Sequence, residues 1–202
     1  VTTNVSIGMG AFALPEGSVT NVQTALTAAF PTLSANTWYH LYLYNNAGEP
    51  AIEISTTAPV PYAYPAHQKT GDATRRYIAS MHTNGSGVMF NQTSQNGQCI
   101  YQSDWAAQRV LGGGVSTVFV AMSVGASVPT TGLEIRLSAY NNGSGTGIAG
   151  IYPRNDNSAS GSVFRTSPGA SVVDFAIQDY PNMYYKYTTT PGGSAFYVDI
   201  GG

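Results

Sequence analysis

Alternating apolar and polar positions run through most of the chain and predict β-strands. Residues 37–44 (TWYHLYLY) are aromatic, aliphatic and β-branched, and residues 51–55 (AIEIS) alternate isoleucine with polar residues. Short runs of this kind, bounded by turn residues, are typical of strands. Residues 45–48 (NNAG) lie between them and predict a turn, so we expect a β-hairpin in this region.

The same pattern recurs to the end of the chain. Clusters of glycine and asparagine, such as 84–87 (NGSG) and 141–145 (NNGSG), separate the apolar runs. Many short strands divided by such turns favour a sandwich or a barrel. We therefore expect an all-β fold, an antiparallel, jelly-roll-like β-sandwich. The further strands expected are 76–83, 87–90, 98–102, 115–124, 133–140, 147–152, 162–166, 171–178, 182–190 and 195–200.

Two segments depart from this pattern. In residues 20–30 the apolar residues have the i, i+3, i+4 spacing of an amphipathic helix, which Thr20 could cap and Pro31 would end. The residues with this spacing are Val22, Ala25, Leu26, Ala29 and Phe30. Threonine-rich segments suit strands equally well, so a short helix and a strand both remain open. Residues 59–65 (PVPYAYP) hold too many prolines for a central strand and are expected to be extended over the surface.

The organisation of the chain indicates one domain over residues 1–202. No linker or repeat divides the 202 residues, a length that one domain can fill. The chain has no initial methionine and ends in Gly201-Gly202, so we expect a fragment of a longer protein. No apolar run approaches the roughly 18–20 residues that span a bilayer. The single cysteine, Cys99, can form no internal disulfide and is expected to be a small buried hydrophobe.

Composition and charge then exclude several classes of partner. Charged residues make up 9% of the chain, and the formal net charge is -2. There is no basic surplus to displace counterions from nucleic acid, and no Lys/Arg stripe to lie on a membrane surface. The 14 Tyr, 7 Phe and 2 Trp are too many for a disordered chain. We expect a polar, weakly charged β-protein that binds no nucleic acid and inserts into no membrane.

Residues that could carry catalysis are scattered along the sequence. His40, His67 and His82 form no metal-binding motif, so no metal is expected. The ten carboxylates show no spacing that marks an acid–base pair, and no G-x-S-x-G motif occurs. A Ser-His-Asp triad could still converge in the fold, because its members need not be neighbours in sequence. The sequence itself predicts no catalytic residues and no cofactor.

Ligand-binding candidates come from aromatic residues near loops and from their polar neighbours. Such side chains offer ring faces and hydrogen bonds to a sugar, although tyrosines on strands usually serve packing. Loops concentrate binding residues, so loop tyrosines are preferred. The candidates are Tyr62, Tyr64, Tyr152, Arg154, Asn155 and Asp156.

One block of the chain resembles a segment common in tailed-bacteriophage and prophage virion proteins. The resemblance covers about positions 36–83, and the closing residues are also similar. The matching stretches are 38–44 (WYHLYLY), 48–59 (GEPAIEISTTAP), 69–78 (KTGDATRRYI) and 196–202 (FYVDIGG). The resemblance implies the distal, β-rich, trimeric receptor-binding domain of a tail fibre or tail spike, located on the virion and outside the cell.

This resemblance implies a function but supplies no catalytic set. It predicts a tip that recognises a bacterial cell-surface receptor, a glycan or a pilus, and that has other virion proteins as partners. A structural virion protein without receptor binding, such as a head decoration or baseplate component, remains an alternative. A polysaccharide depolymerase is disfavoured, because a chain of this length without a repeat cannot form a long β-helix.

Four residues of the block are expected to have structural roles. Trp38 is expected to anchor its strand pair in the core. Asp72 precedes Arg75 and Arg76 by three and four residues, within the sequence Lys69 to Arg76. An aspartate in such a turn can accept hydrogen bonds from the local backbone and from a guanidinium. We therefore interpret this segment as a clasp between a loop and a strand.

Overall fold

The structure is a computed structural model that describes eleven stretches of the chain. They are residues 4–7, 10–63, 66–90, 92–95, 98–101, 109–132, 134–142, 147–156, 162–165, 171–189 and 195–200. The chain divides into two compact units, unit 1 (Val1–Phe90) and unit 2 (Asn91–Gly202). The expectation of a single domain over residues 1–202 stays a prediction.

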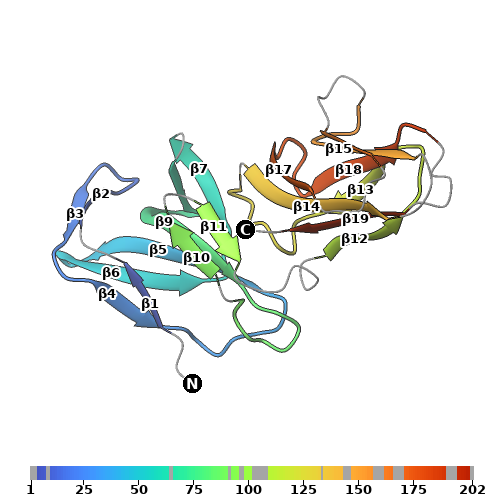
Figure 1. The fold of residues 1–202 in the computed structure, drawn as a ribbon. Coiled ribbons are helices and arrows are strands. Elements are labelled where there is room, and N and C mark those ends of the chain that lie inside the picture. Colours follow the sequence, from blue (N-terminus) through green and yellow to red (C-terminus); the bar gives the residue numbers. More distant parts are fainter. Residues whose placement is uncertain are drawn as a thin grey trace. The chain divides into compact units, whose positions relative to one another are not determined.

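Unit 1 is built on a five-stranded antiparallel sheet with the order β6-β5-β9-β8-β7 (Figure 1). Its strands are β5 (Trp38–Asn46), β6 (Glu49–Ser55), β7 (Pro59–Ala63), β8 (Ala66–Lys69) and β9 (Asp72–His82). Two short antiparallel ladders accompany this sheet. One pairs β1 (Asn4–Ile7) with β4 (Leu26–Ala29), and the other pairs β2 (Gly10–Ala13) with β3 (Val19–Val22).

The expected hairpin at residues 37–55 is confirmed as β5 and β6. Asn46 pairs with Glu49, so the loop consists of two residues, Ala47 and Gly48. Both have positive φ, 52° and 102° respectively. Two consecutive positive φ values define a type I′ turn, whose twist matches that of the flanking strands. Glycine adopts this conformation freely, whereas alanine is strained there.

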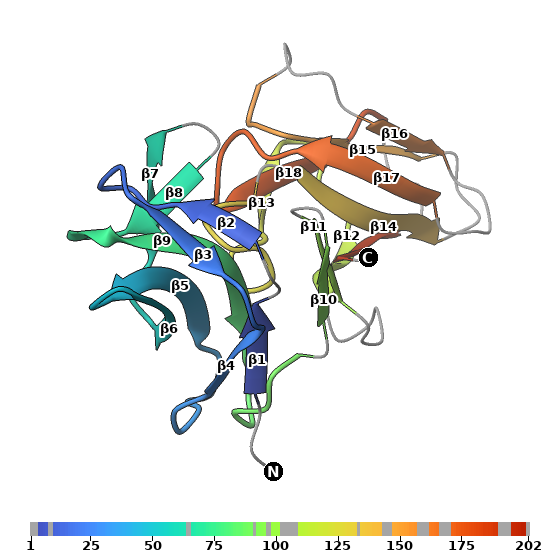
Figure 2. The same cartoon turned by 90° about the vertical axis from the view of Figure 1, so that its left-hand side faces the viewer.

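The apolar core of unit 1 lies on one face of the sheet. Leu41 and Leu43 of β5 contact Ile7 of β1, Leu14 and Val22, all nearly completely buried. The core therefore joins the sheet to both short ladders, whose strands β1 to β4 are labelled in Figure 2. On β5 the alternate residues, including Tyr42 and Tyr44, belong to the opposite face, because successive side chains of a strand point to opposite sides.

The option of a helix at residues 20–30 is wrong. This segment forms the end of β3 and the whole of β4, and Thr20 and Val22 are buried while their neighbours are exposed. That alternation has the period of two expected for a strand. Val22 pairs with Gly10 and Leu26 with Ile7, so both strands find ladder partners. Burial against the sheet and the content of β-branched residues outweigh the helical spacing.

The proline-rich segment lies at an edge of the sheet. Strand β7 carries Pro59 and Pro61 and pairs only with β8, so one side of it has no neighbour in the five-stranded sheet. Prolines lack the backbone donor that a central strand needs, and an edge strand tolerates this loss. The expectation that these residues avoid the centre of a sheet is confirmed for Pro59–Ala63.

Unit 2 contains two four-stranded antiparallel sheets (Figure 1). The first has the order β12-β19-β14-β17, and the second has the order β13-β18-β15-β16. Their strands are β12 (Arg109–Gly114), β13 (Val120–Ser123), β14 (Glu134–Asn142), β15 (Ile148–Tyr152), β16 (Ser162–Arg165), β17 (Ser171–Ala176), β18 (Asn182–Tyr187) and β19 (Ala195–Ile200). Counted within these eight strands, the sheets read 1-8-3-6 and 2-7-4-5. This is the strand order of a jelly roll.

The core of unit 2 lies between its two sheets. Leu137 of β14 and Val198 of β19 on one sheet, and Ile151 and Met183 on the other, have no accessible surface. The rings of Tyr185 and Phe196 approach from opposite sheets with centroids 6.2 Å apart. Contacts of this kind make the two sheets a sandwich.

One glycine of unit 2 makes close packing possible. A Cβ atom added at Gly114 would lie 2.5 Å from the ring of Tyr185. No side chain other than hydrogen fits at that distance, so the approach of β12 to the buried tyrosine depends on glycine.

The fold class is thus confirmed as all-β and antiparallel, with a sandwich of jelly-roll order in unit 2. A separate two-stranded ladder, β10 (Gln92–Gln95) with β11 (Gln98–Tyr101), contains Cys99. The strand expected at 87–90 is reduced to an isolated bridge between Met89 and Thr83. Within the described residues no helix is long and apolar enough to cross a bilayer.

Candidate functional site

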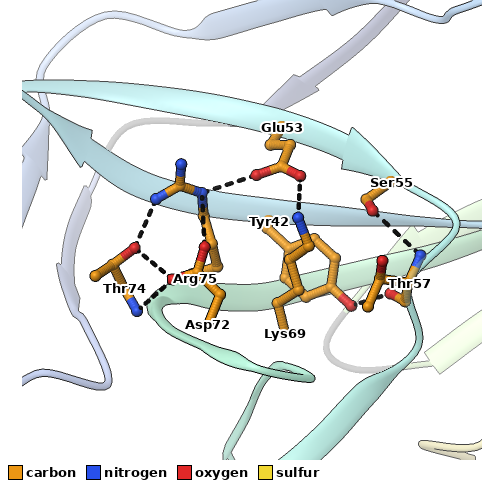
Figure 3. Close-up of polar contacts among 8 residues, drawn as sticks. All are labelled: Tyr42, Glu53, Ser55, Thr57, Lys69, Asp72, Thr74 and Arg75. Carbon is orange, nitrogen blue, oxygen red and sulfur yellow. Dashed lines mark hydrogen bonds and ion pairs between the residues drawn. The ribbon is translucent and has the colours of Figure 1, made fainter.

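A cluster of charged residues lies on the face of the unit 1 sheet opposite its apolar core (Figure 3). The carboxylate of Glu53 on β6 accepts hydrogen bonds from the Lys69 ammonium on β8 and from Nε of Arg75 on β9, the latter at 2.8 Å. Strand β5 lies between them, and the Arg75 guanidinium also packs 3.7 Å from the ring centroid of Tyr44. These contacts therefore link β6 to β8 and β9 across β5.

The turn from β8 to β9 is tied into the same cluster. Asp72 accepts hydrogen bonds from the backbone N–H of Thr74 at 3.0 Å and from its hydroxyl at 2.7 Å. The guanidinium of Arg75 donates to Thr74 Oγ1 at 2.6 Å and lies 3.9 Å from the Asp72 carboxylate. The segment that the sequence analysis interpreted as a clasp thus fastens a turn to its strand, and Glu53 is the main partner of Arg75.

Both carboxyl groups are held in the charged form. Partial burial raises the pKa of Glu53, but hydrogen bonds and charges from Lys69 and Arg75 outweigh this and hold it below its ordinary value. The hydrogen bond from the Thr74 hydroxyl is the largest influence that lowers the pKa of Asp72. With its charges paired internally, the cluster stabilises the sheet, and its cations are engaged with its own carboxylates.

The two other residues expected to be structural lie elsewhere in unit 1. Arg76 donates to the carbonyl of Ala13 at 2.7 Å and so links β9 to β2. Trp38 is half-buried and faces His82, its cross-strand partner, with ring centroids 4.6 Å apart.

A second polar group, on β5 and β9, is centred on two buried side chains, His40 and Ser80. His40 Nδ1 lies 2.7 Å from Ser80 Oγ, and the Tyr77 hydroxyl lies 2.9 Å from the same oxygen. Burial lowers the pKa of His40 to about 4, so the imidazole is neutral at pH 7. A serine beside a neutral imidazole is the pairing that nucleophilic catalysis requires. Here both side chains are at most 6% exposed and the serine is shared with a tyrosine, so the pair is a packing network rather than an exposed nucleophile.

His82 differs from His40 in that one ring atom has no partner. Its Nδ1 is buried without a hydrogen bond among the described residues, and its ring packs against those of Trp38 and Phe90. Burial lowers its pKa, against the opposing effect of a hydrogen bond with the backbone of Asn36. Both imidazoles are therefore neutral parts of a packed face.

The predicted ligand residues of unit 2 gather at the end of β15. Tyr152 is 9% exposed, and its ring meets Phe119 edge-on with centroids 5.0 Å apart. Arg154 and Asn155 are exposed in the turn that follows, and Arg154 forms an ion pair with Asp156 at 2.7 Å. The ring of Tyr152 is thus a packing surface beneath a polar turn, and its burial raises the pKa of its hydroxyl.

The remaining ligand candidates belong to unit 1. Tyr62 is half-buried on the edge strand β7, and Tyr64 lies outside the described residues. The six candidates are therefore divided between the two units, and their role as ligand contacts stays a prediction.

A concave site that the sequence analysis missed lies in unit 1, where β3 and the loop after it face the β5–β6 turn. This groove has a volume of about 480 Å³. Its polar lining consists of Thr20, Asn21, Gln23, Thr24, Asn45 and Glu49. The amide and hydroxyl side chains concentrated at residues 20–24 could have indicated a polar binding site. The helical spacing of apolar residues in the same segment suggested a helix instead.

No group of three or more His, Cys, Asp or Glu residues in the described stretches is arranged to hold a metal ion. No family model matches this chain, and no curated protein is significantly similar to it.

Proposed function

We propose that this chain is a non-enzymatic, host-recognising module of a tailed-bacteriophage virion, located at the tip of a tail fibre or spike. The observation that carries the proposal is the structural coherence of the block that resembles virion proteins. Residues 38–82 form β5 to β9, and the motif residues Asp72 and Arg75 are engaged in the clasp with Glu53. On this proposal, the residues that resemble virion proteins form the scaffold of the domain. The segments around that scaffold contact the receptor.

The fold of unit 2 supports the same proposal. Eight-stranded jelly rolls are common in viral capsid and lectin domains. A fold alone does not determine function, so this support is an analogy. Because the chain carries few charges, we expect it to contact a receptor through amides, hydroxyls and aromatic rings rather than through salt-dependent ion pairs.

The test is competition for adsorption. Host cells are incubated with saturating purified chain before the phage that encodes it is added, and free phage is counted. The proposal expects adsorption to fall towards the level of receptor-negative cells, and heat-denatured chain serves as the control. Unchanged adsorption would overturn receptor binding and favour a structural role in the head or baseplate.

The proposal also includes a homotrimer. Light scattering of the intact chain should then give three times the chain mass of 21.2 kDa. A monomeric mass with full competition for adsorption would remove the trimer from the proposal and leave recognition in place. Release of reducing ends from host polysaccharide by the purified chain would instead indicate a depolymerase.

A further inference from the structure

The groove between β3 and the β5–β6 turn has the chemistry of a small polar ligand site. Its volume of about 480 Å³ falls within the roughly 300–1,000 Å³ usual for ligand pockets. Its lining comes from three separate segments, β3 with its following loop, the start of β4, and the β5–β6 hairpin. Thr20 is buried with Val22 on one face of β3, whereas Asn21 and Gln23 are exposed.

Two neighbouring features hold the groove open. The type I′ turn at Ala47 and Gly48 fixes the end of the hairpin, and Asn45 Oδ1 accepts a hydrogen bond from the Gly48 N–H at 2.6 Å. This bond uses the carbonyl oxygen of the Asn45 amide and leaves its NH₂ group as a donor. Thr20 and Val22, buried on the same strand, fix β3 on the other side.

The polar groups of the lining are available to a ligand. Within the described part of the chain, the side chains of Asn21, Gln23 and Glu49 have no hydrogen-bond partner or ion pair. Amides and carboxylates that converge on a concavity can bind a ligand rich in hydroxyl groups, because each offers donors or acceptors at short range.

The composition of the lining disfavours anionic ligands and planar bases. Glu49 is the one ionisable side chain among the described lining residues, so a phosphate or carboxylate ligand would meet no cation. No described lining residue is aromatic, so a planar base would find no ring to stack on, and a sugar would be held by hydrogen bonds and aliphatic contacts alone. Small apolar surfaces from Val19, Leu26 and Pro50 fit the C–H groups of a sugar ring.

We propose that this groove binds a neutral hexose or N-acetylhexosamine unit of a glycan. The inference rests on the proposed function and deepens it, because it assigns receptor contact to unit 1 and to an uncharged saccharide. Asn21, Gln23 and Asn45 supply amide hydrogen bonds, Glu49 accepts hydrogen bonds from hydroxyl groups, and the apolar residues face the ring.

The test is a titration of the intact chain followed by NMR. The probes are the methyl glycosides of glucose, galactose, mannose and N-acetylglucosamine, with sodium glucuronate as the anionic comparison. We expect at least one neutral probe to cause saturable shifts of the amide signals of residues 19–26 and 45–50, with a Kd of about 1–10 mM. Glucuronate should cause none there.

A matched pair of variants identifies the groups involved. Asn21→Ala combined with Gln23→Ala should raise the Kd by about tenfold or more, the loss expected from two hydrogen bonds. Asn46→Ala removes an exposed amide next to Asn45 that does not line the groove, and it should leave the Kd within about twofold. All three substitutions are at exposed positions, and the spectra report directly on whether each variant is folded.

The outcomes separate the two proposals. Absence of groove shifts with all four neutral probes, in a chain that competes for adsorption, would overturn the groove and leave the proposed function standing. Equal loss of affinity in the Asn46→Ala variant would also overturn it. Saturable groove binding without competition for adsorption would instead overturn the virion function and leave a saccharide site.

Discussion

Units 1 and 2 are both all-β, but they bury different polar chemistry. Unit 1 contains all three histidines of the sequence, and it buries His40 and His82 on the sheet face opposite its apolar core. Unit 2 has no histidine and buries the carboxylate of Asp199, which Arg109 holds at 2.8 Å. Its two sheets are joined by a hydrogen bond from the Tyr187 hydroxyl to Asn141 Oδ1 at 2.6 Å.

This difference shows where each unit is vulnerable. A jelly roll encloses its core between two sheets, so most of its polar groups lie outside. The five-stranded sheet of unit 1 has a second face, opposite its apolar core, and this face carries imidazole and tyrosine rings that pack against one another. A buried imidazole is stable only while it is neutral, because charging it without a partner is costly. The two units should therefore respond differently to acid.

The largest expected effects come from the two cores. Leu137→Ala in unit 2 and Leu43→Ala in unit 1 each remove a side chain without accessible surface and should cost about 2–5 kcal/mol of unfolding free energy. If the units unfold separately, hydrogen exchange will show each loss in one unit alone. If either substitution lowered the unfolding free energy of both units equally, the chain would unfold as a single cooperative domain. The two units could then not differ in stability.

The next effect is a loss of stability between pH 6.5 and 4 that arises from the buried histidines of unit 1. The pKa of His40 is about 4 in the folded chain and 6.5 in its ordinary state. Between these values the unfolded chain binds a proton that the folded chain does not, so the free energy of unfolding falls as the pH falls from 6.5 to 4. The loss approaches about 3 kcal/mol at the lower end.

Hydrogen exchange at a series of pH values, corrected for intrinsic rates, checks this expectation. His82 titrates in the same direction and adds to the loss. His40→Gln should flatten the profile of unit 1, and the profile of unit 2 between pH 6.5 and 4.5 should be unaffected by that substitution. An unchanged profile of unit 1 in the variant would show that His40 is not responsible.

A smaller effect separates the ion pairs of the two units. Glu53→Gln removes the charge that holds Lys69 and Arg75 on a half-buried face, and it should cost about 1–2 kcal/mol. Asp174→Asn breaks the pair with Arg136, in which both side chains are about half exposed, and it should cost much less than Glu53→Gln because solvent screens this pair. Urea unfolding at pH 7 measures both, and equal costs would contradict the difference in burial.

The smallest effect is a gain in stability at the β5–β6 turn. Ala47 has a φ of 52°, which glycine and asparagine adopt at lower cost. Ala47→Asn should therefore stabilise unit 1 by about 0.5 kcal/mol, measured as a higher urea midpoint with an unchanged slope. A lower midpoint would show that the strain at Ala47 is already compensated by its surroundings.

Strands could be predicted from the sequence where the apolar residues fit the period of a strand and not also that of a helix. The alternation in residues 37–55 indicates both strands and the turn between them, because the core face and the outer face carry different residue types. It failed at residues 20–30, where Val22 and Leu26 fit both a helix and a strand. Ladder partners in β2 and β1 decide that case, and no local pattern contains them.

The candidate site was harder to predict than the fold. A groove is formed by residues that meet only after folding, such as Gln23 after β3 and Glu49 on β6. Tyrosines such as Tyr152 suggested binding by their residue type, but packing against Phe119 buries that ring. The contact between Asp72 and Arg75 was predictable because these residues are three positions apart in the sequence. Glu53, the main partner of Arg75, lies on another strand and was not predicted.

The prolines of β7 have a consequence for how copies of this chain behave when crowded together. An exposed strand edge can recruit a strand from another molecule, and edge-to-edge pairing of this kind leads to aggregation. Pro59 and Pro61 leave two of the five residues of β7 without a backbone N–H. The sheet therefore offers an incomplete template for strand pairing on that side.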